Sequence, residues 1–252
     1  MEKHSLRMRA GVACVGLVVL AGSLTLLVTP DPPEEQVFPI AQMPTVVIDA
    51  GHGGKDEGAK CKGVQEKTLA LDVALRLGRI LNARGFSTTQ TRTEDVFLTL
   101  AERTEIANRV KDPAIFVSIH FNQGSGREIA GIETFYADNK VPTITDWTWV
   151  GFFSRPESFD MGEELAAEVQ YAAILKTGAK DRGIRARHLF VTRHTRLPAV
   201  LVEGGFITNR MESTLLNEEH YADTLAAGIA DGIESWWRTQ QKSLPSSLAR
   251  KE

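Results

Sequence analysis

Apolar residues follow two different spacings along this chain. Short apolar runs rich in β-branched residues predict buried strands, and the clearest of them are residues 45–49, 114–119 and 199–202. Weaker runs predict strands over residues 86–92, 131–137 and 189–192. Apolar residues at helical spacing predict helices over residues 66–84, 98–110, 161–176 and 217–237. Strands that alternate with helices indicate an α/β domain, whose parallel-rich central sheet is flanked by helices on both faces.

Two of these helices carry more specific predictions. Gly85 follows the helix predicted over residues 66–84, where a glycine is a common helix stop. In the helix predicted over residues 98–110, we expect the polar side chains of Glu102, Arg103 and Glu105 to face solvent.

The first 30 residues differ from the rest of the chain. Residues 11–29 carry no charge, with basic residues before them and Pro30 after them, which is typical of an export signal. The run is nearly long enough to span a bilayer, so we favour an uncleaved membrane anchor over a cleaved signal, and both over a buried core helix. The positive-inside rule then places the rest of the chain outside the cytoplasm, in the periplasm or cell envelope.

The remaining sequence divides into three parts. Residues 31–43 are a proline-rich linker, residues 44–238 a single folded domain and residues 239–252 a polar tail that we expect to be loose. The whole chain has a formal net charge of −3, which argues against nucleic-acid binding. Its two cysteines exclude a disulfide-rich scaffold.

Residues whose side chains can bind a metal or transfer a proton follow three of the predicted strands. His52 comes after residues 45–49, His120 after 114–119 and Glu203 after 199–202, while Glu66 opens the first predicted helix. The carboxyl ends of parallel strands meet at one edge, where α/β proteins place their sites. Two imidazoles and one carboxylate suffice to hold a catalytic zinc ion, and a second carboxylate can act as a general base. Each residue alone is more often structural, so the prediction rests on the four together.

The segments around these four residues share a sequence pattern. They read VVIDAGHGGKDEGA (46–59), Glu66-Lys67, Thr91-Arg92, Arg103 with Ala107-Asn108, SIHFN (118–122) and LPAVLVEGGFITN (197–209). This pattern, from about residue 45 to 237, resembles the zinc-dependent N-acetylmuramoyl-L-alanine amidases, the amidase-3 type of peptidoglycan hydrolase.

That resemblance implies roles for the four residues. His52, Glu66 and His120 would be ligands of one Zn²⁺ per chain, and Glu203 would be the catalytic carboxylate. The reaction implied is hydrolysis of the amide that joins N-acetylmuramic acid to the L-alanine of the peptidoglycan stem peptide. Two other functions stay open: a zinc peptidase that cuts within the stem peptide, and a non-catalytic cell-wall binding protein.

Four further residues are candidates for the surroundings of the site. Asp49 and Asn108 either orient the metal ligands or make structural hydrogen bonds. Arg182 and Arg185 flank Gly183 and are candidates for binding stem-peptide carboxylates.

Residues 138–160 are rich in aromatic side chains. We expect a loop that either contacts glycan or peptide beside the cleft, or blocks the cleft until an activator protein moves it. The structural alternative is a loop whose aromatic side chains pin it to the core.

Overall fold

The computed structural model describes residues 43–61, 63–111, 113–138 and 157–243. The predicted signal or anchor, nearly all of the linker and residues 139–156 of the aromatic segment lie outside these ranges. No helix in the described ranges combines the length and apolar character needed to cross a membrane.

A six-stranded sheet forms the centre of the domain, in the order β4-β1-β5-β8-β6-β7. The strands are β1 (Thr45–Ala50), β4 (Ser87–Gln90), β5 (Ala114–Asn122), β6 (Ile132–Tyr136), β7 (Asp181–Ala186) and β8 (Ala199–Phe206). The first four in spatial order run parallel, and β6 pairs antiparallel with β8. The prediction of a parallel-rich sheet is confirmed. A separate short hairpin joins β2 (Lys60–Cys61) to β3 (Val64–Gln65).

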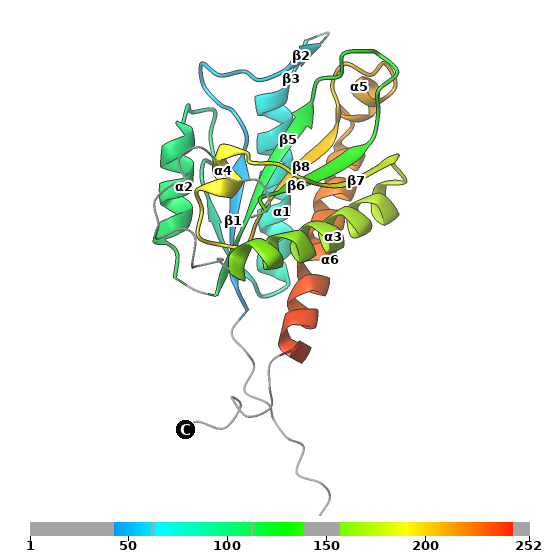
Figure 1. Ribbon diagram of the computed structural model, residues 1–252. Coiled ribbons are helices and arrows are strands. Elements are labelled where there is room, and N and C mark those ends of the chain that lie inside the picture. Colours follow the sequence, from blue (N-terminus) through cyan, green and yellow to red (C-terminus); the bar gives the residue numbers. More distant parts are fainter. Residues whose placement is uncertain (1–42, 62, 112, 139–156, 244–252) are drawn as a thin grey trace, which may run out of the picture. The chain divides into compact units, whose positions relative to one another are not determined.

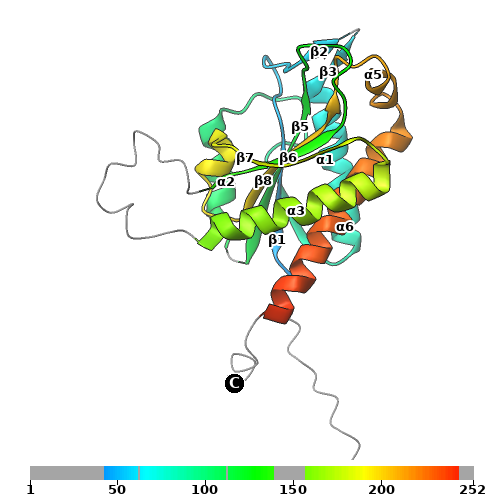
Figure 2. The same cartoon turned by 45° about the vertical axis from the view of Figure 1, so that its right-hand side comes forward.

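Helices cover both faces of this sheet, as predicted (Figures 1 and 2). One face carries the three long helices α1 (Glu66–Ala83), α3 (Glu157–Thr177) and α6 (Glu219–Ser243). The other carries α2 (Leu100–Arg109) and the short α4 (Phe190–Arg193). A further short helix, α5 (Glu212–Leu215), follows β8.

Alternation along the strands divides the core into two clusters. On β1, Val46 and Ile48 pack with α1 and α6, whereas Val47 faces the opposite side together with Phe116 of β5. Successive side chains of a strand point to opposite faces, so a strand covered on both faces must be apolar throughout. This is why these strands read as nearly unbroken apolar runs, and two polar exceptions, Asp49 and Ser118, are buried and hydrogen-bonded to each other.

Helix ends follow local signals in the sequence. Gly85 adopts a left-handed conformation, with φ of 89°, directly after the α1 C-cap. At the start of α2, the Thr99 hydroxyl accepts from the Glu102 amide, and the Glu102 carboxylate accepts from the Thr99 amide. This reciprocal capping box fixes where α2 begins.

Three predicted element boundaries or types differ from the structure, and one strand was not predicted. Residues 189–192 lie mostly in α4, because Arg193 and His194 donate to the carbonyls of Leu189 and Phe190 and close a helical turn. Strand β7 was not predicted, since it is polar and lies at the edge of the sheet. Helix α6 continues through the first residues of the predicted tail, and α3 begins within the predicted aromatic loop.

Candidate active site

Three predicted ligand residues converge at the carboxyl edge of the sheet. The Glu66 Oε1 atom lies 2.8 Å from His120 Nδ1 and 3.0 Å from His52 Nε2. One ligand atom from each of the three residues lies within 4.8 Å of the others, and in the described ranges this is the one cluster of its kind. The structure therefore brings together the set that the sequence predicted.

Backbone amides hold the Glu66 carboxylate in place at the first residue of α1. Its Oε1 accepts from the Phe121 amide at 3.1 Å and its Oε2 from the Ala59 amide at 2.8 Å. Burial raises the pKa of this carboxyl, whereas hydrogen bonds from His120 and His52 lower it by more. The resulting pKa lies well below its usual range. Glu66 is thus held ionised, which is the form that ligates a metal.

The loop after β1 presents His52 in an uncommon conformation. His52 has φ of 58°, in the left-handed region that residues with side chains seldom adopt. Its Nδ1 pairs with Asp56 Oδ2 at 2.9 Å, which directs Nε2 toward Glu66. Asp56 was not singled out from the sequence, although its position four residues after His52 in the glycine-rich run could have suggested a partner.

Glycines make room for the imidazoles. A Cβ atom at Gly51 would lie 2.4 Å from the His120 ring. A Cβ atom at Gly58 would lie 2.5 Å from Glu66 Oε2 and 2.7 Å from the His52 ring. The glycines of this loop therefore let the backbone approach the ligands closely.

Two buried arginines fix the backbone of the same loop. Arg92 donates to the carbonyls of Ala50 and Gly51, and Arg103 donates to those of Ala50 and His52. Arg103 also pairs with the Asp49 carboxylate at 2.7 Å. The prediction that Arg103 faces solvent is wrong: its side chain is 3% exposed, because its guanidinium satisfies buried carbonyls and a buried carboxylate. Asp49 thus acts on His52 through Arg103.

Glu203 lies next to the ligand cluster on the neighbouring strand. It is opposite His120 in the register of β5 and β8. Its Oε2 is inaccessible to solvent and has no hydrogen-bond partner among the described residues. Burial raises its pKa from an ordinary 4.5 to about 7. A carboxyl group in this state can both take up and release a proton near neutral pH.

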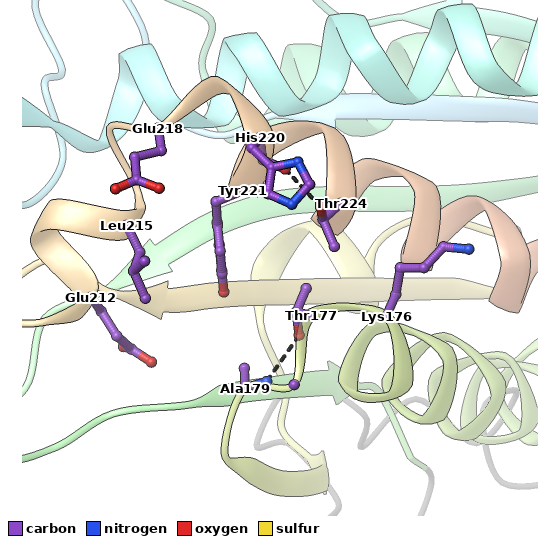
Figure 3. A pocket seen from close by; sticks show the side chains of 10 residues that line it. Lys176, Thr177, Ala179, Glu212, Leu215, Glu218, His220, Tyr221 and Thr224 are labelled. Atoms are coloured by element: carbon purple, nitrogen blue, oxygen red, sulfur yellow. Dashed lines mark hydrogen bonds between the residues drawn. The ribbon is translucent and has the colours of Figure 1, made fainter.

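Two residues that line a separate hollow form hydrogen bonds with the backbone at the end of β8. Figure 3 shows this hollow between the C-terminal end of α3 and the start of α6. The Tyr221 hydroxyl donates to the carbonyl of Gly204, the residue after Glu203. The Glu212 carboxylate accepts from the amides of Gly131 and Phe206. Both side chains therefore hold the segment that carries Glu203, and neither belongs to the ligand cluster.

Arg182 and Arg185 meet at a buried carboxylate beside Glu203. Both approach Glu133 Oε2, at 3.2 and 3.5 Å respectively. Glu133 lies opposite Glu203 in the antiparallel register of β6 and β8. The sequence prediction missed Glu133, although its place in the apolar strand IETFY marks a buried charge that needs partners.

Asn108 contacts a different part of the chain. Its side chain donates to the His194 carbonyl and accepts from the Arg196 amide, which fixes the turn after α4. These contacts correspond to the structural alternative for Asn108.

The residues present fit a zinc ion. Two imidazole nitrogens and one carboxylate oxygen converge, as in zinc sites that keep a fourth position for water. The unpartnered Oε2 of Glu203 adds a carboxylate beside them that the protein's own hydrogen bonds leave unused.

Comparison with known proteins identifies relatives of the whole domain. An endolysin of Bacillus phage SPP1 is 36% identical over 199 residues, which cover 79% of this chain and 68% of the relative. The N-acetylmuramoyl-L-alanine amidase LytC of Bacillus subtilis is 34% identical over 194 residues, which cover 77% of this chain but 36% of LytC. The match thus spans only part of LytC, which is longer than this chain.

A solved structure extends the similarity to the fold. The N-acetylmuramoyl-L-alanine amidase from Clostridium difficile 630 superimposes with a TM-score of 0.69 at 33% identity, covering 79% of this chain and all of that one. The family described as N-acetylmuramoyl-L-alanine amidase matches residues 46–235, a range that contains every strand of the sheet except the first residue of β1. The chain therefore belongs to the N-acetylmuramoyl-L-alanine amidase family of peptidoglycan hydrolases.

Proposed function

We propose that this protein hydrolyses the amide between N-acetylmuramic acid and the L-alanine of the stem peptide, with Glu203 as general base and acid and with one zinc ion. The observation that carries the proposal is the buried, unpartnered Glu203 Oε2 next to the cluster of His52, Glu66 and His120. Membership of the amidase family supports the choice of substrate and bond.

In this proposal the two histidines and Glu66 hold the metal. His52 offers Nε2, because Asp56 engages its Nδ1, and His120 offers Nδ1. When bound, a zinc ion acts as a Lewis acid and lowers the pKa of water to about 7. Asp49, Arg92 and Arg103 contribute by fixing the backbone on which His52 is placed.

Glu203 moves the proton. Its Oε2 accepts a proton from the attacking water and then donates it to the nitrogen of the leaving L-alanine, which departs as a neutral amine. Burial raises the pKa of Glu203 to about 7 in the protein without a metal, and a carboxyl group with a raised pKa can both take up and release a proton. Tyr221 and Glu212 keep the end of β8 at the position that this transfer requires.

The proposed substrate also implies a location. Peptidoglycan lies outside the cytoplasm, and the uncharged segment over residues 11–29 is the predicted means of export and membrane contact. An activator that acts on residues 138–160 stays a prediction.

Substitution of the proposed base tests the mechanism. Glu203→Gln keeps the size of the side chain but cannot accept a proton, so we expect hydrolysis of purified peptidoglycan to fall by roughly 100-fold or more. Zinc content should stay at one ion per chain, because Glu203 is not a ligand. Glu105→Gln, at an exposed position of α2, is the matched control. Unchanged hydrolysis by Glu203→Gln would reject this role.

A peptidase that cuts within the stem peptide would use the same side chains. Family membership favours the amidase, and the position of the cut distinguishes the two activities.

A further inference from the structure

Arg182 and Arg185 of β7 project from the same face of the sheet as Glu203. In a regular strand, residues three apart point to opposite faces. Here a register shift between β6 and β7, at left-handed Gly183 with φ of 77°, adds the residue that brings both arginines to one face. Arg185 pairs with Phe135, which packs beside Leu201, and Leu201 precedes Glu203 by two residues on β8.

Glu133 organises the two guanidinium groups. It is 4% exposed, its Oε1 accepts from Asn122 at 2.8 Å, and its Oε2 faces both arginines. Glu133, Arg182 and Arg185 together carry one net positive charge, and the carboxyl groups of Glu212 and Glu203 lie nearby. Each arginine approaches Glu133 through Nε, and in the described part of the chain their terminal nitrogens make no hydrogen bond. The Arg182 guanidinium lies over the Phe206 ring, 4.9 Å from its centre.

This positive group lies at a fixed distance from the proposed base. Glu133 is opposite Glu203, and β7 is the next strand beyond β6. Neighbouring strands lie about 4.8 Å apart, so the backbone of Arg182 is roughly 10 Å from that of Glu203. An extended peptide advances about 3.5 Å per residue. An arginine side chain is long enough to span the rest of the roughly 10 Å between the backbones of Arg182 and Glu203.

We propose that Arg182 and Arg185 form an anion-binding subsite for the carboxylate of the stem-peptide residue that follows L-alanine, with Glu133 as the positioning residue. This inference rests on the proposed function, because it takes the stem peptide as substrate. Guanidinium groups bind carboxylates through paired, charge-assisted hydrogen bonds, and an amide in place of the carboxylate cannot accept them in the same way. The enzyme should therefore distinguish a free carboxylate from an amide at this position.

Two matched substrates test the subsite. They are N-acetylmuramoyl tripeptides whose second residue, a γ-linked D-glutamate, carries either a free α-carboxylate or an α-amide. We expect the full-length protein to prefer the carboxylate by about tenfold in kcat/KM, mainly through KM. Arg182→Gln and Arg185→Gln should each lower this preference to about twofold or less.

Controls separate folding and the proposed function from the subsite. Arg185 is 55% exposed, so its substitution preserves the fold, and Arg109→Gln on α2 is the control at a distant exposed arginine. Equal hydrolysis of both substrates by the parent would overturn the subsite and leave the amidase function standing. An unchanged preference in both arginine variants would also overturn it. If the parent cleaved the lactyl amide of neither substrate, the subsite would fall together with the proposed function.

Discussion

The guanidinium of Arg103 donates a hydrogen bond of 2.6 Å to the backbone carbonyl of His52. Arg103 also forms an ion pair of 2.7 Å with Asp49, and both side chains are buried. His52 itself has a left-handed backbone, a conformation that persists in proteins only where its surroundings enforce it. The buried pair therefore holds the backbone of His52, a proposed metal ligand, in this conformation.

Removal of Arg103 should affect both stability and metal binding. Arg103→Met leaves the Asp49 carboxylate buried without its charged partner, so the free energy of unfolding should fall by about 3–5 kcal/mol. Zinc affinity should fall by tenfold or more, as for other residues that support a ligand. Urea denaturation and zinc titration measure the two effects. Arg109→Met on α2 is the control, and an equal loss in both variants would contradict the account.

The free space beside the proposed metal ligands should be as important for zinc binding as the ligands themselves. Gly58→Ala would place a Cβ atom 2.5 Å from Glu66 Oε2, so we expect loss of zinc binding and of activity. Gly178→Ala provides a close control, because Gly178 has nearly the same φ, 66° against 63°, and a Cβ atom added there would meet no heavy atom within 4 Å. Zinc binding measured on both purified variants separates crowding from backbone strain, and retention of zinc by Gly58→Ala would show that crowding is unimportant.

The stability of the zinc-free protein should depend on pH through Glu203. Because burial raises its folded-state pKa to about 7, the folded protein holds a proton that the unfolded chain releases near pH 4.5. This contribution is complete below pH 4.5 and is lost as pH rises through 7, on the order of 3 kcal/mol. Glu203→Gln should remove this dependence, and so be more stable than the parent at pH 8 in a chelator. Urea denaturation at pH 4.5 and pH 8 measures the difference, and parallel pH profiles for the two proteins would contradict it.

Substitution of His120 and substitution of His220 should have different effects on the zinc content of the protein. His120→Ala removes one of three ligands and should abolish stoichiometric zinc. His220→Ala, at the exposed start of α6 and outside the cluster, should retain it. Elemental analysis after dialysis decides between the two, and zinc retained by His120→Ala would remove this residue from the ligand set.

The residues of the site were predictable from the sequence because their chemistry coincides with strand ends. His52, His120 and Glu203 each follow an unbroken apolar run, and parallel strands deliver such residues to one edge. The central strands were also predictable, because a strand buried on both faces is a nearly continuous run of apolar residues and does not alternate between apolar and polar ones.

The support around the site was not predictable in the same way. Arg103 was expected in solvent, because helical spacing shows which face of α2 is polar. It does not show that the buried Asp49 carboxylate lies next to that face. Glu133 meets both Arg182 and Arg185 because a register shift between β6 and β7 brings Arg185 to the same face, and residues so far apart in sequence give no sign of that arrangement. Strand β7 was missed because an edge strand lacks the apolar signature of a central one.

The position of the cut in peptidoglycan tests the central claim most directly. Purified peptidoglycan is digested with the full-length protein in the presence of zinc, and the products are identified by mass spectrometry. The account predicts stem peptides that begin with a free L-alanine amine, together with glycan chains whose N-acetylmuramic acid has lost its peptide. Fragments cut within the stem peptide, with L-alanine still attached to the sugar, would contradict it.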